Sequence, residues 1–86
     1  MNSEKIENQI LQIVNKTIIK YKKKITKKDL NLKLYKSGII DSLDYIRIIN
    51  DIEKTFKIKM KIETLDINFS ISSMKNTLRK KILKSK

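Results

Sequence analysis

The sequence predicts an all-α fold, a small antiparallel four-helix bundle made of three long helices and a short third helix. Apolar residues recur every three or four positions in three long segments, as on one face of an amphipathic helix. Proline is absent and glycine occurs once, so no linker is indicated and we expect a single domain over residues 1–86. With 40% hydrophobic residues, a chain of 86 residues can bury one small core.

The first long helix is predicted over residues 4–22, directly after Ser3, a residue type that favours the N-cap position. Lysines 22 to 24 stand at its end, where positive charge suits the carbonyl end of the helix dipole. The expected core stripe consists of Ile6, Ile10, Leu11, Ile13, Val14, Ile18 and Tyr21.

Residues 25–41 contain no helical stripe. Leu30, Leu32 and Leu34 alternate with polar residues, which is also typical of a short strand. A lone strand would have no partner in this chain, so we expect a long ordered loop that these leucines attach to the core. Gly38 permits a backbone conformation that other residues avoid.

The second long helix is predicted to begin at Ser42 and to end near Phe56. Asp41 is expected at the N-cap, with Asp44 three residues further on as a short version of a capping box. The expected apolar stripe consists of Leu43, Ile46, Ile49, Ile52 and Phe56.

The last part of the chain predicts one short and one long helix. One or two helical turns are expected between Ile62 and Ile67. Ser70 is expected to cap the last helix. The apolar stripe of that helix consists of Ile71, Met74, Leu78 and Ile82.

The composition also excludes several classes of function. The chain has no cysteine and no histidine, which removes disulfides, thiolate chemistry, the usual metal ligands and the commonest general base. We therefore expect no metal site and no catalytic residues. No apolar run approaches the ~18 residues of a membrane span, and the first residues do not resemble a signal peptide, so a cytoplasmic protein is expected.

The net charge of +12 has two explanations. Lysine, isoleucine and asparagine account for 43 of the 86 residues, and A+T-rich codons favour all three. Much of the lysine excess is thereby attributed to the composition of the genome. The alternative is a functional basic surface.

Ser42 is the candidate functional residue. A serine in the first turn of a helix presents its hydroxyl to solvent, beside backbone N–H groups that have no partner within the helix. Those donors and the helix dipole would stabilise an anion attached there, such as a phosphate. Without a histidine to activate it, the serine is better suited to be modified than to act as a nucleophile.

The segment around Ser42 resembles the acyl carrier proteins and the related peptidyl and aminoacyl carrier proteins. The family pattern is a glycine shortly before Asp-Ser-Leu, then an aliphatic-rich helix that ends in an acid and a phenylalanine. This chain shows the pattern over about 19 residues, and the predicted helices match the family's loosely over nearly the whole chain. The matching residues are Gly38, Asp41, Ser42, Leu43, Asp44, Ile46, Ile49, Ile52, Glu53 and Phe56.

The resemblance implies a non-catalytic carrier. A phosphopantetheinyl transferase would attach 4′-phosphopantetheine from coenzyme A to Ser42, making a phosphoprotein. The terminal thiol of that arm would then carry an acyl or aminoacyl group as a thioester. An acyl- or aminoacyl-loading enzyme and condensing or transfer enzymes would be its partners, in fatty-acid, polyketide, nonribosomal-peptide or aminoacyl-transfer biosynthesis, and the carrier is expected to be a monomer.

In this family the second helix is the usual surface that partner enzymes recognise, through basic patches of their own. From Asp41 to Glu53 the chain carries a net charge of −3, whereas the rest carries +15. We therefore expect acids to steer partners to this helix while apolar residues border the contact. The expected docking residues are Asp41, Leu43, Asp44, Ile46, Arg47 and Asp51.

The sequence also departs from the family pattern. Family members are mostly acidic, and Arg47 stands where many relatives have an acid. Two residues, Ile39 and Ile40, separate Gly38 from the Asp-Ser-Leu motif, which looks more like stand-alone carriers of specialised pathways.

Two alternatives to the carrier remain open. One is a small basic nucleic-acid-binding helical protein that contacts phosphates through residues 22–24, 27–28 and 79–81. The other is an interaction subunit with the carrier fold and no modification.

Overall fold

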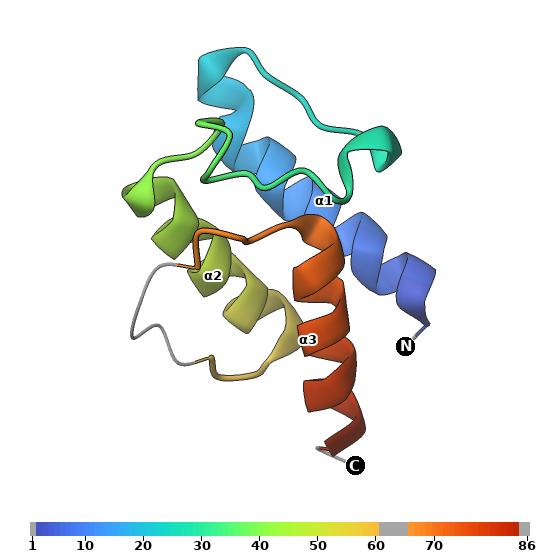
Figure 1. Ribbon diagram of the computed structural model, residues 1–86. Helices are drawn as coiled ribbons and strands as arrows, with labels where there is room; N and C mark the ends of the chain where they lie inside the picture. The colour runs from blue at the N-terminus through green and yellow to red at the C-terminus, as the bar shows by residue number, and fades with distance from the viewer. Residues whose placement is uncertain (1, 61–65, 85–86) are drawn as a thin grey trace.

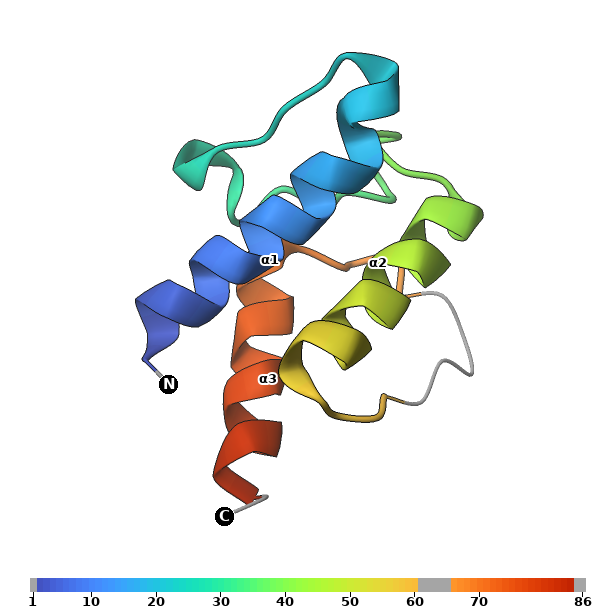
Figure 2. The same ribbon diagram turned by 180° about the vertical axis from the view of Figure 1, so that it is seen from behind.

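The computed structural model describes residues 2–60 and 66–84 of the chain. They contain three α-helices, α1 (Ser3–Ile18), α2 (Ser42–Phe56) and α3 (Ile71–Lys84), and two short 3₁₀ turns, η1 (Ile19–Tyr21) and η2 (Lys27–Asp29). Helix α1 runs in the opposite direction to α2 and α3 (Figures 1 and 2). The described residues contain no strand, so the all-α prediction is confirmed.

The predicted short third helix falls mostly on residues outside the described ranges. Of that segment, the structure describes only residues 66 and 67, which lead into a turn before α3. Within the described residues, no helix is both long enough and apolar enough to cross a membrane.

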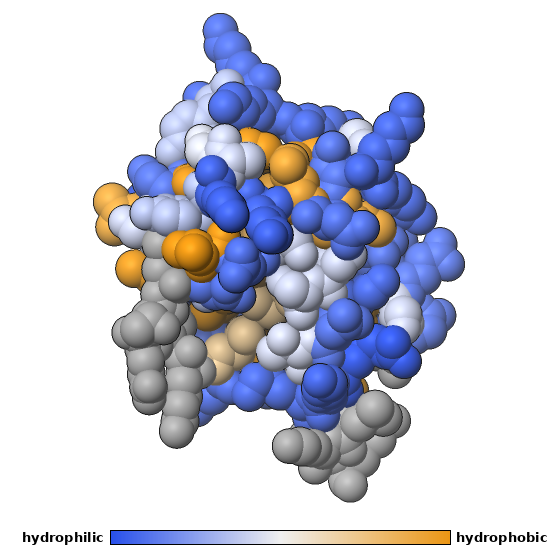
Figure 3. Space-filling view, in the orientation of Figure 1, coloured by the Kyte–Doolittle hydropathy of each residue, from blue (hydrophilic) through white to orange (hydrophobic). Residues whose placement is uncertain are grey.

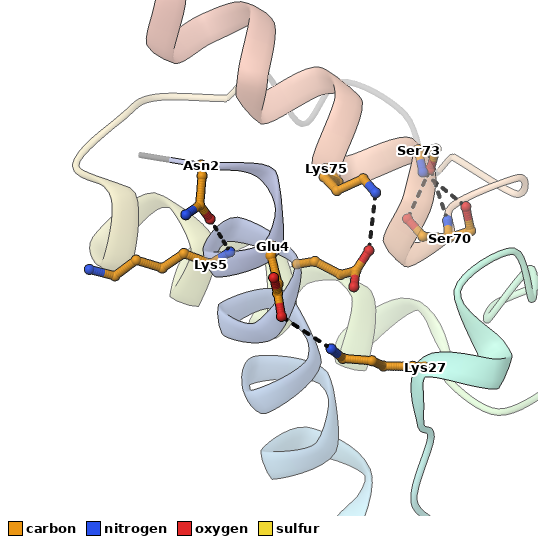
Figure 4. A network of polar contacts seen from close by, with 8 residues as sticks. Asn2, Glu4, Lys5, Lys27, Ser70, Ser73 and Lys75 are labelled. Carbon is orange, nitrogen blue, oxygen red and sulfur yellow. Dashed lines mark hydrogen bonds and ion pairs between the residues drawn. The ribbon is translucent and has the colours of Figure 1, made fainter.

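Helix α1 begins and ends differently from the prediction. Its N-cap is Asn2 and not Ser3, and the Asn2 side chain accepts a hydrogen bond of 2.8 Å from the backbone N–H of Lys5 (Figure 4). The α-helix stops at Ile18 and continues as η1 until Lys22, which adopts a left-handed conformation with φ of 58°. The α-helix therefore ends four residues before the predicted end at residue 22, and the chain turns at Lys22.

The core lies where the inner faces of α1, α2 and α3 meet. The predicted stripe of α1 is buried from Ile6 to Ile18, but Tyr21 is 40% exposed and does not belong to it. In α3, Ile71, Met74 and Leu78 are buried and Ile82 packs partly against them, as predicted.

The buried face of α2 differs from the predicted stripe. Leu43 and Ile46 are 68% and 42% exposed, so these two members of the expected apolar stripe do not belong to the core. The buried residues of this helix are Asp44, Tyr45, Ile48, Ile49 and Ile52. Compared with the predicted stripe, the buried face is shifted around the helix axis to include Tyr45. The ring of Tyr45 packs edge-on against that of Phe69, with ring centroids 5.4 Å apart.

The long segment between η1 and α2 is an ordered loop, as predicted. Leu34 is fully buried, while Leu30 and Leu32 pack partly against the core. The loop is also bonded to the start of α3, because the Leu34 N–H donates to the Phe69 carbonyl and the Ser72 N–H donates to the Leu30 carbonyl.

Gly38 makes the turn that leads from this loop to α2. Its φ is +84°, a region that side chains disfavour, although a Cβ there would meet no atom within 4 Å. The glycine is therefore required by backbone conformation and not by lack of space.

Polar contacts join α3 and η2 to α1 (Figure 4). The ammonium of Lys75 on α3 lies 3.0 Å from the carboxylate of Glu7 on α1. Ser70 and Ser73 bond reciprocally at the start of α3, where each hydroxyl accepts from the other residue's backbone N–H. Ser70 therefore caps this helix, as predicted.

Candidate functional site

Ser42 is the first residue of α2 and is exposed to solvent. Its hydroxyl forms no hydrogen bond with any described residue, and the backbone N–H groups of Ser42 and Leu43 have no acceptor there. A negatively charged group on the Ser42 oxygen would therefore meet unoccupied donors at the positive end of the helix dipole.

The start of α2 is fixed by a reciprocal capping box. The Asp44 N–H donates to the Asp41 carboxylate over 2.8 Å, and the Asp41 N–H donates to the Asp44 carboxylate over 3.2 Å. This arrangement confirms the predicted roles of the two aspartates in capping. It holds the backbone on both sides of Ser42.

The Asp44 side chain also connects α2 to the end of α1. It is completely buried, although it is ionisable. One carboxylate oxygen lies 2.7 Å from the ammonium of Lys20, and the other accepts a hydrogen bond of 2.7 Å from the Tyr21 hydroxyl. Burying a carboxylate is costly unless it is paired and hydrogen-bonded, and these two residues provide that pairing.

The pKa values of these groups follow from their contacts. Burial acts to raise the pKa of Asp44, but bonds from Lys20, Tyr21 and the Asp41 backbone outweigh it and leave the pKa below its usual value. The hydrogen bond to Asp44 raises the pKa of both Lys20 and Tyr21 above their usual values. Asp44 is thus stabilised as a carboxylate inside the protein.

The expected role of Asp44 as an exposed docking acid is wrong. Its side chain is buried, and its oxygens are occupied by Lys20, Tyr21 and the Asp41 backbone. The physical reason is the rotation of α2, which turns Asp44 inward together with Tyr45 and Ile48. A partner protein could not reach this carboxylate without displacing the end of α1.

The other expected docking residues lie on the outside of α2. Asp41, Leu43, Ile46 and Arg47 are exposed, and Asp51 is half-buried. Figure 3 shows hydrophobic surface at the left edge, over the first part of α2 as seen in Figure 1. Apolar side chains therefore border Ser42 on the surface.

Of the four acids from Asp41 to Glu53, three accept hydrogen bonds from backbone N–H groups. Asp41 and Asp44 cap the start of the helix, and Glu53 accepts a hydrogen bond of 2.8 Å from the Met60 N–H after its end. Asp51 forms no such bond within the described residues. Most of the negative charge that the sequence gathers on this helix therefore stabilises its two ends.

Lys20 and Tyr21 are the site residues that sequence reasoning missed. They come from η1 and precede Asp44 by more than 20 residues, so no local pattern joins them to α2. A signal was nevertheless present. Asp44 shares a helix face with Ile48 and Ile52, and an acid on a buried face requires a cation or donors from another element.

The expected absence of a metal site can be compared only with the described residues. In the described part of the chain, no group of three or more Asp, Glu, His or Cys side chains could hold a metal ion.

Comparison of the chain with protein-family models, with curated proteins and with solved structures finds no match.

Proposed function

We propose that this protein is a carrier whose Ser42 receives 4′-phosphopantetheine from coenzyme A. The Ser42 oxygen forms a phosphodiester to the arm, and the thiol of the arm carries an acyl or aminoacyl intermediate as a thioester. The observation that carries the proposal is an exposed serine hydroxyl that bonds to none of the described residues, at a helix start that a buried Asp44 holds in place. The resemblance around Ser42 supplies the chemistry.

The local geometry supports a phosphate on Ser42 in two ways. The free N–H groups of Ser42 and Leu43 can donate to phosphate oxygens, and the helix dipole favours negative charge there. The nearby Asp44 carboxylate is paired with Lys20, which reduces its repulsion of a phosphate. The chain has no histidine, so the transferase would supply the base that removes the serine proton.

The surface beside Ser42 supports recognition by partner enzymes. Leu43 and Ile46 expose apolar side chains, and Asp41, Arg47 and Asp51 surround them with charge. Apolar contact with a charged border is typical of protein–protein interfaces. We propose that a transferase, a loading enzyme and a condensing or transfer enzyme bind there in turn, and that tethering keeps the intermediate at high effective concentration.

The test is to incubate the protein with coenzyme A and a broad-specificity phosphopantetheinyl transferase, and to record the intact mass. We expect a gain equal to one phosphopantetheine group that disappears in Ser42→Ala. Ser37→Ala is the matched control, because Ser37 is an exposed serine in the preceding turn. A wild-type protein that gains no mass would overturn the proposal.

Binding of nucleic acid without a mass gain would favour the alternative function. Single-stranded nucleic acids usually stack on exposed aromatic rings. Here Tyr45 and Phe69 are buried, and the exposed Tyr21 bonds to Asp44. Tyr35 and Phe56 pack partly against the core, so the described aromatic residues give the nucleic-acid alternative little structural support.

A further inference from the structure

An open groove of about 370 Å³ lies between α1 and α2. The two helices lie side by side in Figures 1 and 2, and their facing side chains form its walls. Its charged lining consists of Lys16 of α1 and Lys20 of η1 on one side, with Arg47, Asp51 and Lys54 of α2 on the other. Four cationic side chains and one carboxylate therefore line the groove.

The positive charge of the groove is largely uncompensated. The charge of Lys20 is compensated by the buried Asp44, with which it forms an ion pair. Lys16, Arg47 and Lys54 are exposed, and none lies within ion-pair distance of a carboxylate in the described ranges. Asp51 balances one of these three charges, so the groove keeps a net positive charge.

The groove is continuous with the surface beside Ser42. Leu43, Arg47, Asn50 and Lys54 follow one another at spacings of four, three and four residues, which places them in one row along α2. Leu43 stands at the N-terminal end of this row, is 68% exposed and follows Ser42 directly. A partner that reaches Ser42 over Leu43 would therefore meet Arg47 and Lys54 next.

We propose that the groove between α1 and α2 is a docking site for an acidic segment of a partner protein. This inference rests on the proposed function and gives its partner a specific chemistry. The sign of the charge is opposite to the sequence-based expectation, in which acids on the second helix met basic patches of the partner. The reversal follows because Asp44 is buried, while Lys16, Arg47 and Lys54 are exposed.

A protein fits this surface better than a nucleic acid or a free anion. Leu43 and Ile46 add an apolar contact beside the cations, as protein interfaces require and phosphate backbones do not. The cations lining the groove are long and exposed, so they suit several spread carboxylates better than one small ion. Their charge would also speed the encounter with an acidic partner.

The experiment measures binding of a short fluorescent peptide of glutamate and leucine to the full chain by fluorescence anisotropy. The double variant Arg47→Glu/Lys54→Glu removes the groove charges on α2. The matched control is Arg79→Glu/Lys80→Glu, which makes the same charge change at exposed positions of α3. An RNA oligonucleotide of equal charge is the second probe.

We expect the groove variant to weaken peptide binding roughly fivefold at low salt, and the α3 control to weaken it by less than about twofold. RNA should lose about the same affinity in both variants, because it senses only the overall charge. Equal peptide losses in the two variants, or no peptide binding to the wild type, would overturn the inference. Tighter binding of RNA than of peptide, lost only in the groove variant, would also overturn it.

The mass gain at Ser42 is recorded on the same samples. Its absence from the wild type would overturn the proposed function while the peptide data still report on the groove. A mass gain that persists in every variant, with peptide binding that does not distinguish them, would overturn only the groove. The two failures are therefore distinguishable.

Discussion

Helices α2 and α3 both begin with a reciprocal capping box, but the two boxes differ in chemistry. At α2 the box is made of two carboxylates, and one of them, Asp44, is buried against Lys20 and Tyr21 of η1. At α3 it is made of two neutral hydroxyls, from Ser70 and Ser73. Both boxes satisfy N–H donors that a helix cannot satisfy by itself.

The difference shows why the Ser42 hydroxyl takes no part in capping its helix, whereas the hydroxyls of Ser70 and Ser73 do. Ser70 and Ser73 use their hydroxyls to bond the backbone of α3, so those oxygens are occupied. At α2 the aspartates perform that task, and the Ser42 hydroxyl between them forms no bond within the described residues. Charged caps stabilise the α2 start and leave Ser42 available.

The largest expected effect comes from removing the buried carboxylate. Asp44→Ala should lower the free energy of unfolding by ~2 kcal/mol, because it breaks the capping box and removes the partner of Lys20 and Tyr21. Urea denaturation at neutral pH measures this. Asp51→Ala is the control, since Asp51 forms no bond in the described part of the chain, and it should change stability by less than about 0.5 kcal/mol. Equal losses in the two variants would contradict the role given to Asp44.

Lowering the pH should remove part of the stabilisation that the Asp44 carboxylate provides. The pKa of Asp44 is lower in the folded protein than the ~3.9 expected of an unfolded chain, so the unfolded state binds more protons in this range. Its contribution is complete above about pH 5 and is lost as the pH falls below about 4, through the folded pKa. Urea denaturation across this range should show the stability difference between wild type and Asp44→Asn shrinking as pH falls. A difference that stays constant would be inconsistent with this pairing.

The capping box of α3, made of two serines, should contribute less to the free energy of unfolding than the box of α2, made of two aspartates. Ser70→Ala should lower the free energy of unfolding by ~1 kcal/mol, as is typical when an N-cap hydroxyl is lost. The loss should not depend on pH between about 3 and 7, because neither Ser70 nor Ser73 titrates in that range. Urea denaturation at both ends of this range checks it, with Ser72→Ala as a neighbouring control. A loss larger than that of Asp44→Ala would reverse the comparison.

The smallest effect is expected at Ser42 itself. Ser42→Ala should change the free energy of unfolding by less than about 0.5 kcal/mol, because the hydroxyl is exposed and unbonded within the described residues. Thermal unfolding followed by circular dichroism is sufficient to measure it. A loss similar to that of Ser70→Ala would mean that Ser42 is part of the capping structure, and it would weaken the case for an attachment site.

Much of the fold could be predicted from local patterns. Helix α2 begins at Ser42 and ends at Phe56 as predicted, because a capping aspartate and apolar periodicity both act within a few residues. The cap at Ser70 and the inner face of α3 are correct for the same reason. The end of α1 was not predictable in this way, because Tyr21 continues the apolar spacing and the lysines after Ile18 also favour a helix.

What the sequence by itself determined is the all-α class, the bounds of α2, its capping aspartates and the position of Ser42 at a helix start. Tertiary structure alone decided which face of α2 is buried. That choice depends on contacts between distant residues, such as Tyr45 with Phe69, and it turns Asp44 inward and Leu43 outward. A buried carboxylate needs partners, and Lys20 and Tyr21 can supply them only because packing brings the end of α1 beside the start of α2.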